Sequence, residues 1–195
     1  METVKRVAKT GAKTRGDLLI MAEDYLAEIG KKEYFPQIKE KMQEYGYPLD
    51  SKEINVMSWY PMAMEISFIF SLVEVLNWGE KEITKLGRDF TRISFIEKIV
   101  AKYLLSPQVT FEKANEIWRK HMDTGELESV ELNEIEKYAI FRLKNFDIHP
   151  IYCQFLCGML ESFCDIVTKS KENLCRETKC TFRGADWHEF LITWK

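Results

Sequence analysis

The chain has 195 residues, and its 28 basic and 31 acidic residues give a net charge of −3. This length suffices for one domain, with or without a helical extension, that buries about 70% of its unfolded surface without help from disulfides. The two signs of charge are mixed along the chain, whereas nucleic-acid-binding domains concentrate Lys and Arg. The composition therefore argues against a nucleic-acid partner.

The N-terminal segment and the cysteines indicate the compartment. Residues 1–15 are basic and lack an apolar run of signal-peptide length, so we expect a frayed arm and a cytoplasmic protein. All five cysteines lie beyond residue 152. An odd number of cysteines in a cytoplasmic chain is more typical of free thiols or metal ligands than of a disulfide framework.

Two amphipathic segments near the N-terminus predict helices. The first runs from Asp17 to Ile29 after a capping-box-like Thr14-x-x-Asp17, and the second runs from Phe35 to Tyr45. Together they indicate a helical hairpin, and we expect residues 1–50 to form an N-terminal helical extension. Residues 52–60 contain enough Ile, Val and aromatic side chains for a short strand, but they lack clean alternation.

The segment from Pro61 to Leu76 is strongly apolar. A membrane-spanning helix needs about 20 apolar residues. This run is shorter and is interrupted by Glu65 and Glu74, so we expect a buried helix and no membrane span. An isolated carboxylate in such a helix needs a partner, and Arg88 or Arg92 could serve Glu65. Glu65 would otherwise lie beside a ligand with a raised pKa, or face solvent.

Helical spacing continues over residues 81–105 and 111–122 and then gives way to alternation. Gly87, inside the first of these helices, costs about 1 kcal/mol relative to Ala, which indicates close approach of another helix or of a ligand. From Glu126 to Leu132 and from Tyr138 to Phe146, apolar and charged residues alternate as they do in a β-hairpin.

The helix expected from Pro150 to Asp165 is apolar almost all round, which indicates that it is covered on both sides. Cys153, Cys157 and Cys164 fall on one face of this helix. Core packing as small hydrophobic residues is the favoured interpretation of the three cysteines, and thiol chemistry or metal binding is the alternative.

Strand patterns complete the chain. They fall at residues 166–169, 173–182 and 187–194. Helices followed by strand pairs that flank one helix define an α+β domain over residues 51–195, with helices packed on an antiparallel sheet.

The terminal hairpin is expected to bring a thiol and an imidazole together. If Gly184 lies at the centre of the tip, Cys180 and His188 face each other across two strands with Cβ atoms roughly 5 Å apart. Both residue types suit zinc, but a tetrahedral site needs about four ligands, so Cys175 or a cysteine of the helix would have to complete it. A packed or surface pair without a metal is the simpler interpretation.

The same pair allows a catalytic interpretation. His188 could lower the pKa of Cys180 and so produce a thiolate nucleophile. Asp186 is placed to orient the imidazole ring, whereas strand alternation puts Glu189 on the opposite face. This arrangement would make the chain a cysteine-dependent hydrolase or transferase.

These residues also carry a resemblance. The C-terminal half runs from Trp118-Arg119 through Asp123-Thr-Gly125-Glu126 and the helix opening from Asp147 to Gly158. It ends in Glu177, Cys180, Gly184, Asp186, His188 and Phe190. It resembles the 4-vinyl reductase domain family, which shares its fold with heme nitric-oxide-binding-associated domains and TRAPP vesicle-tethering subunits. The family ending looks like Glu-x-x-Cys-x-x-x-Gly-Asp-x-x-Cys-x-Phe, so Asp186 is displaced by one and His188 stands where the second cysteine would be. The resemblance is good from about Trp118 onward, loose in the middle and absent over residues 1–50.

The resemblance implies a non-catalytic sensory or carrier domain that binds a hydrophobic or tetrapyrrole-like small molecule. It also implies a metal held through cysteines, for which zinc at Cys175, Cys180 and His188 is our expectation, because His188 retains a zinc ligand where the family has cysteine. The sensory role would need a downstream signalling protein, which the sequence leaves unidentified.

The expected ligand chamber lies among the apolar helices. Aromatic and thioether side chains make adaptable pocket linings, although plain core packing explains most such stripes. The candidate ligand-binding residues are Glu65, Phe68, Gly87, Phe90, Phe155 and Met159.

Three functional hypotheses follow. The leading one is the small-molecule-binding sensory or carrier domain, and the second is the cysteine enzyme that uses Cys180 and His188. The third is a scaffolding protein that forms a homodimer through its long helices, as TRAPP-type subunits do. A reactive thiol at Cys180 would distinguish the enzyme, and a retained ligand would distinguish the sensor from the scaffold.

Overall fold

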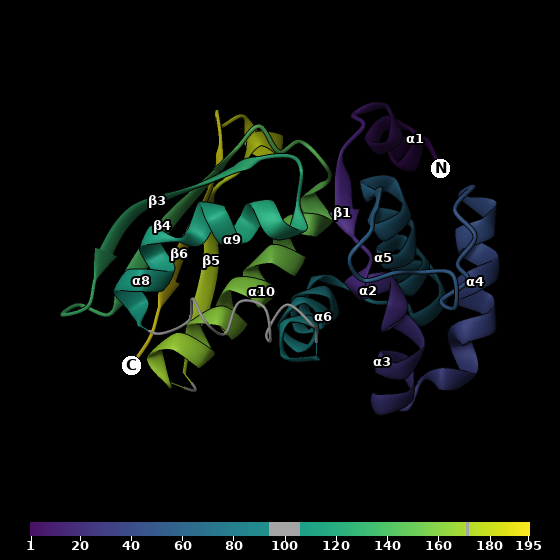
Figure 1. Ribbon diagram of the computed structural model, residues 1–195, viewed down its shortest axis with the longest axis horizontal. Coiled ribbons are helices and arrows are strands. Elements are labelled where there is room, and N and C mark those ends of the chain that lie inside the picture. The colour runs from purple at the N-terminus through teal and green to yellow at the C-terminus, as the bar shows by residue number, and fades with distance from the viewer. Residues whose placement is uncertain (94–105, 171) are drawn as a thin grey trace. The chain divides into compact units, whose positions relative to one another are not determined.

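A computed structural model of the chain describes residues 1–93, 106–170 and 172–195 (Figure 1). The chain divides into two compact units, Met1–Glu82 and Ile83–Lys195. We call them unit 1 and unit 2. The sequence placed a boundary near residue 50, whereas the structure assigns the segment from 51 to 82 to the N-terminal unit, because its long helix packs on the helices that precede it.

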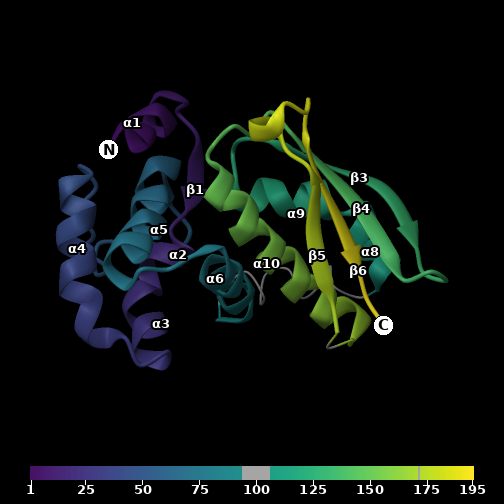
Figure 2. The same ribbon diagram turned by 180° about the vertical axis from the view of Figure 1, so that it is seen from behind.

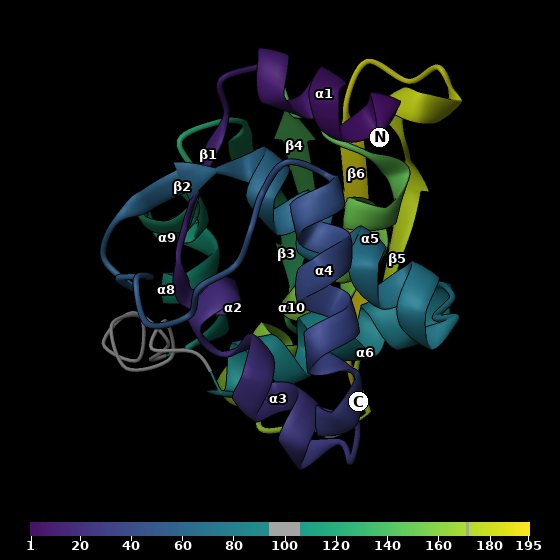
Figure 3. The same cartoon turned by 90° about the vertical axis from the view of Figure 1, so that its right-hand side faces the viewer.

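Unit 1 is mainly helical. Its elements are α1 (Glu2–Lys9), β1 (Lys13–Arg15), α2 (Asp17–Ile20), α3 (Ala22–Glu28), a 3-10 turn (Lys32–Tyr34), α4 (Phe35–Glu44), β2 (Trp59–Pro61) and α5 (Met62–Leu76). In Figure 3, α4 runs alongside α5, and the two helices are in contact. Of the strand expected over 52–60, only the end is a strand in the structure, as β2, which pairs antiparallel with β1.

The expected frayed arm is wrong. Its residues form α1 and β1, and Val4 and Val7 are each only 1% exposed because α1 packs against α5. The spacing of these two valines on one helical face supplies the apolar contact that the basic composition concealed.

The apolar helix expected after Pro61 is confirmed as α5. Ser67 and Ser71 lie inside it, and their hydroxyls donate to the carbonyls of Ala63 and Ser67 at 2.6 and 2.7 Å. These bonds satisfy the buried hydroxyl groups within the helix itself. The helix ends at Asn77, which takes the left-handed conformation with φ of 52°.

Unit 2 contains most of α6 and all later elements. These are α6 (Glu80–Ile93), α8 (Pro107–Glu112), α9 (Ala114–His121), β3 (Glu126–Asn133), β4 (Tyr138–Lys144), α10 (Pro150–Thr168), β5 (Leu174–Lys179), a 3-10 turn (Thr181–Arg183) and β6 (His188–Thr193). The helix expected over 81–105 is present as α6, and its second half lies outside the described residues. The strand expected at 166–169 is wrong, because α10 continues to Thr168 and ends at Lys169 in the left-handed conformation.

Four strands among the described residues of unit 2 form one antiparallel sheet with the order β3-β4-β6-β5. Helices α8, α9 and α10 cover one face of it, as the two opposite views in Figures 1 and 2 show. The expected α+β architecture of helices on an antiparallel sheet is therefore confirmed. On the covered face, Phe141 of β4 lies opposite Phe190 of β6, and Leu143 lies opposite His188.

Helices α6 and α10 approach each other at two glycines. A Cβ atom added to Gly87 would lie 2.0 Å from the carbonyl oxygen of Phe155, and one added to Gly158 would lie 1.8 Å from that of Thr84. No larger residue fits either position without separating the backbones. The glycine expected to mark a close approach therefore lies at a helix crossing.

Arg88 forms ion pairs across the same helix crossing. Its guanidinium donates to Glu161 at 3.0 Å and to Asp165 at 2.7 Å, and Arg92 adds a bond to Asp165 at 3.2 Å. Both arginines, which the sequence offered as partners of Glu65, thus bind carboxylates of α10.

Among the described residues, α10 is one helix that is long and apolar enough to cross a membrane, but over half of its apolar window is buried in the structure. Such burial is what the core helix of a folded domain shows.

Candidate functional site

Two features of unit 2 are candidates for function, and the first is a cluster of metal-ligand side chains. It consists of Cys153 of α10, Glu177 of β5, Cys180 just after β5, and His188 of β6, and their ligand atoms all lie within 4.8 Å of one another. Cys153, Cys180 and His188 are 2%, 3% and 1% exposed. We call this group the CECH cluster.

Cys180 reaches His188 by a loop and not by the strand pairing that the sequence suggested. The β5–β6 ladder ends at Lys179 opposite Glu189, and His188 pairs with Leu143 on the other side. After Cys180 the chain makes a 3-10 turn and passes through Gly184 with φ of 88°. The amides of Arg183 and Ala185 donate back to the Cys180 carbonyl at 3.0 and 3.1 Å, which fixes the loop against the cluster. The expected proximity is therefore present, with a different geometry.

Neighbouring groups fix the orientation of the His188 ring. Nε2 lies 2.9 Å from the carbonyl oxygen of Phe146, which can only accept, so Nε2 carries a proton. Nδ1 points into the cluster, 2.8 Å from Oε1 of Glu177 and 3.5 Å from Sγ of Cys153. Nδ1 and the Glu177 carboxylate are hydrogen-bond partners in this arrangement, and a metal ion would take both as ligands.

The surroundings of the cluster shift the pKa values of its thiols and of its carboxylate in opposite directions. Burial, reinforced by the charge of Glu177, raises the pKa of the Cys153 and Cys180 thiols above the ordinary value. Burial alone would raise the pKa of Glu177 as well, but hydrogen bonds from His188 and both thiols lower it below its ordinary value. A nucleophilic cysteine needs a lowered pKa. The thiolate expected at Cys180 in the catalytic interpretation is therefore not favoured by this environment.

The same donor set suits a metal of the zinc type. Zinc takes tetrahedral sets of Cys sulfur, His nitrogen and carboxylate oxygen, and closed four-ligand sets are typical of structural sites. Soft thiolates with imidazole also select zinc over magnesium or calcium. Arg183 donates to the second carboxylate oxygen of Glu177 at 2.7 Å, so the carboxylate is held in place and its charge is partly balanced.

Cys175 lies outside the CECH cluster. It lies on the same face of β5 as Glu177 but two residues further from the loop, opposite Ile192. Burial raises the pKa of Cys175, and contact with the thiol of Cys157 adds to this effect. Its amide donates to Glu161 at 3.0 Å. The structure thus brings together two of the three expected ligands and adds Cys153 and Glu177.

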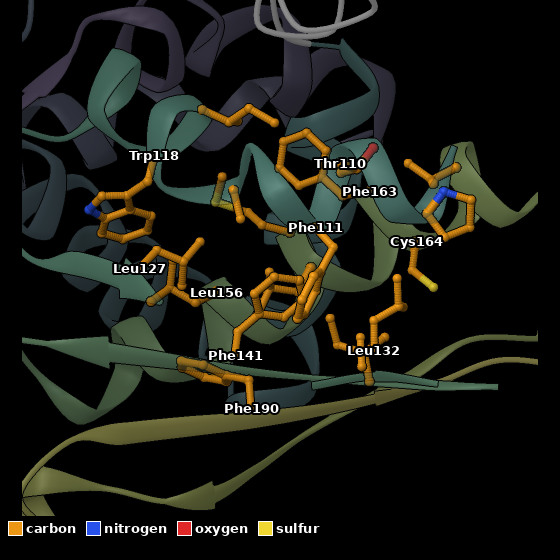
Figure 4. Close-up of a pocket in the computed structure, with 18 of the residues that line it drawn as sticks. Thr110, Phe111, Trp118, Leu127, Leu132, Phe141, Leu156, Phe163, Cys164 and Phe190 are labelled. Atoms are coloured by element: carbon orange, nitrogen blue, oxygen red, sulfur yellow. The ribbon is translucent and has the colours of Figure 1, made fainter. Parts of the chain in front are cut away.

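The second feature is an apolar cavity of about 120 Å³ between the sheet and helices α8 to α10 (Figure 4). None of the described residues that line it is Lys, Arg, Asp or Glu. Phe111 of α8 and Phe141 of β4 meet within it, with ring centroids 5.4 Å apart. The wall also includes Trp118, Leu127, Leu132, Leu156, Phe163 and Phe190. This composition favours uncharged ligands.

The expected ligand-binding residues are distributed over both units. Met159 lines the cavity. Phe155 is fully buried and packs on Phe90 at 5.7 Å, next to the helix crossing at Gly87. The remaining two lie in α5 of unit 1, at Glu65 and Phe68, and both are buried.

Comparison with known proteins shows the fold. No protein-family model and no curated protein matches the chain. Solved structures of H-NOX proteins are similar. One is an H-NOX protein from S. oneidensis in the Fe(II)NO ligation state, with a TM-score of 0.66 and 11% identity over 92% of this chain and 99% of that one.

Two further structures give the same result. A mutant of T. tengcongensis H-NOX has a TM-score of 0.63 and 12% identity over 91% of this chain and 96% of its own. An oxygen-binding H-NOX domain related to soluble guanylate cyclases has a TM-score of 0.57 and 11% identity over 82% of this chain and 85% of its own. The chain therefore has an H-NOX-like fold. Sequence identity this low carries the fold alone.

Proposed function

We propose that unit 2 is a non-catalytic sensory or carrier domain that binds an uncharged, apolar small molecule in the cavity. The observation that carries this proposal is a cavity inside a folded unit with an aromatic and aliphatic wall and no charged side chain among the described residues. A charged ligand would lose its hydration there without gaining a side chain of opposite charge among the described lining residues. An apolar ligand would lose only unfavourable contact with water.

The size of the cavity limits the ligand. An engineered apolar cavity of about 150 Å³ stays dry and binds benzene or xenon. A cavity of about 120 Å³ thus suits a single small ring or a short hydrocarbon without rearrangement of its wall. Larger ligands would require Phe111 or Phe163 to move.

A heme does not fit this cavity, although one similar structure comes from work on heme distortion in the H-NOX family. Pockets that enclose even drug-sized ligands measure about 300–1,000 Å³. The described lining also offers no Arg or Lys to receive heme propionates. Axial donors such as His121 and Cys164 are present, but they do not compensate for the missing volume and charge. The tetrapyrrole part of the original expectation is therefore not proposed for unit 2.

We propose further that the CECH cluster binds zinc as a structural metal. Four ligand residues from separate segments converge there, and the hydrogen bond of His188 Nε2 directs Nδ1 into the cluster. A metal would link α10 to β5, β6 and the loop between them. When bound, it would deprotonate the two thiols and stabilise the loop that carries Cys180.

The resemblance to the 4-vinyl reductase domain family extends the proposal. Glu177 and Cys180 belong both to the family-like ending and to the CECH cluster, and His188 replaces a family cysteine within it. By this resemblance we propose a cytoplasmic homodimer that passes its signal to a separate protein. A scaffolding role would need neither the cavity nor the cluster, and the mass of the native assembly together with its ligand content distinguishes the two.

Ligand binding is tested by calorimetric titration of the full chain with benzene. We expect saturable binding in the wild type and its loss in Ala114→Leu, because Ala114 lines the cavity and the added methyl groups occupy it. Ala27→Leu is the matched control, since Ala27 is an exposed residue of α3. Equal benzene binding by both variants would show that the ligand sits elsewhere.

A further inference from the structure

The CECH cluster and the cavity share two structural elements. Helix α10 carries Cys153 and, one turn later, Leu156 of the cavity wall. Strand β6 carries His188 and, two residues along on the same face, Phe190 of the wall. The metal ligands and the cavity wall are therefore neighbouring side chains on the same helix and the same strand.

Direct contacts join the two features through buried rings. The ring of Phe190 stacks on His188, with centroids 6.4 Å apart and an interplanar angle of 17°. Phe190 is 1% exposed and forms part of the cavity wall. The position of Phe190 and the orientation of the His188 ring therefore depend on each other, because packed rings cannot move independently.

A second path runs through Phe146. Its carbonyl accepts from Nε2 of His188 at 2.9 Å, and its ring packs edge-on against Trp118 at 5.4 Å. Trp118 lines the cavity, and its indole nitrogen donates to the Thr124 carbonyl at 2.9 Å, so its position is fixed on both sides. The residue that orients the metal-binding ring thus also supports the cavity wall.

We propose that metal occupancy of the CECH cluster and ligand occupancy of the cavity are thermodynamically coupled, each strengthening the other. This inference rests on the proposed function, because it presumes that both sites are used. It adds a regulation that neither site has alone, in which the affinity for the apolar ligand reports the metal status of the protein.

The sign of the coupling follows from the geometry. Ligand atoms in a tetrahedral zinc site lie roughly 3.3–3.8 Å apart, given metal–ligand distances of about 2.0–2.3 Å. Nδ1 of His188 already lies 3.5 Å from Sγ of Cys153, so a metal would hold β6 and α10 at this spacing. Cluster atoms that are up to 4.8 Å apart would draw closer around the metal. A ligand that fills the cavity holds Phe190 and Trp118 against the same elements. Whichever binds first orders groups that the other needs in place.

The test measures benzene affinity of the full chain with and without zinc, and zinc affinity with and without benzene. We expect zinc to strengthen benzene binding about tenfold, within the usual range for coupled sites, and benzene to strengthen zinc binding by the same factor, as linkage requires. Benzene binding of equal strength in both states overturns the coupling alone. No benzene binding in either state overturns the proposed function and the coupling with it.

An uncoupling variant separates communication from stability. Phe146→Leu keeps the backbone carbonyl that holds His188 but removes the ring that contacts both Trp118 and the His188 ring. We expect this variant to bind both zinc and benzene. The factor by which one strengthens the binding of the other should fall from about tenfold to below about threefold. Phe70→Leu is the matched control, because Phe70 packs on Tyr45 in unit 1, and it should retain the full factor.

If the metal-free protein does not stay folded, the rate of zinc release to a chelator provides the measurement from the loaded state. Benzene should slow this release in the wild type and in Phe70→Leu, but much less in Phe146→Leu. A rate of zinc release from the wild type that benzene does not change overturns the coupling.

Discussion

Filling the cavity should stabilise the protein. Ala114 of α9 is buried and lines the cavity. We expect the three carbon atoms that leucine adds at this position to enter the cavity. A cavity of about 120 Å³, at about 24 cal/mol per Å³, costs close to 3 kcal/mol of stability. Three buried carbons at about 0.8 kcal/mol each should recover about 2 kcal/mol of this. The helix propensities of Ala and Leu differ little, so the backbone contributes almost nothing.

The assay is urea unfolding of wild type and Ala114→Leu, with the exposed Ala27→Leu as control. We expect the urea midpoint of Ala114→Leu to rise at an unchanged denaturant slope. The free energy of unfolding of the control should stay within about 0.5 kcal/mol of the wild-type value. A loss of more than about 1 kcal/mol in Ala114→Leu would mean that the site is already filled, since overpacking a dense core costs that much. That result would refute the cavity and the ligand-binding proposal that depends on it.

Three other predictions concern the CECH cluster, the crossing of α6 and α10, and a buried carboxylate of unit 1. Cys153→Ser should lower bound zinc from one equivalent to well below one by metal analysis, whereas Cys175→Ser should retain it, because only Cys153 belongs to the cluster; the opposite order would contradict the assignment. Gly158→Ala should cost about 3 kcal/mol in urea unfolding, since its Cβ would meet the Thr84 carbonyl at 1.8 Å, while Gly79→Ala, with no contact closer than 3.5 Å, should be nearly neutral. Burial raises the pKa of Asp17 from 3.8 to about 6, so the folded state holds the proton more tightly than the unfolded state. The associated stability is complete below pH 3.8 and is lost as the pH rises through 6, by about 2 kcal/mol between pH 4.5 and 7.5. Asp17→Asn should remove this slope, and an unchanged slope would assign it to other groups.

Periodic patterns in the sequence predicted the long elements well. Helices α4, α5 and α10 and the β3–β4 hairpin were expected near their observed positions, because each repeats its apolar residues over several turns or pairs. The end of α10 was missed because Ile166 and Val167 are β-branched and read as a strand, while packing of the helix overrides that preference. Short α1 was missed because Val4 and Val7 give only one repeat of the pattern.

The candidate site was predicted only in part, because some of its residues are far apart in the sequence. Cys180 and His188 are close in sequence, so a hairpin was enough to bring them together. Cys153 is 35 residues from His188, and only the docking of α10 on the sheet places its thiol 3.5 Å from the imidazole. Glu177 belonged to the motif that carries the family resemblance, but nothing local distinguished it from a surface carboxylate. The cavity is a property of packing and has no local signature.

The most direct test of the central claim is a crystal structure of the zinc-loaded protein soaked with bromobenzene, with anomalous data collected at the zinc and bromine edges. The account predicts a bromine peak among Phe111, Phe141 and Phe163 in unit 2 and a zinc peak bonded to the four residues of the CECH cluster. A cavity without bromine at saturating bromobenzene, or bromine located only on the surface, would contradict the claim that unit 2 binds apolar small molecules.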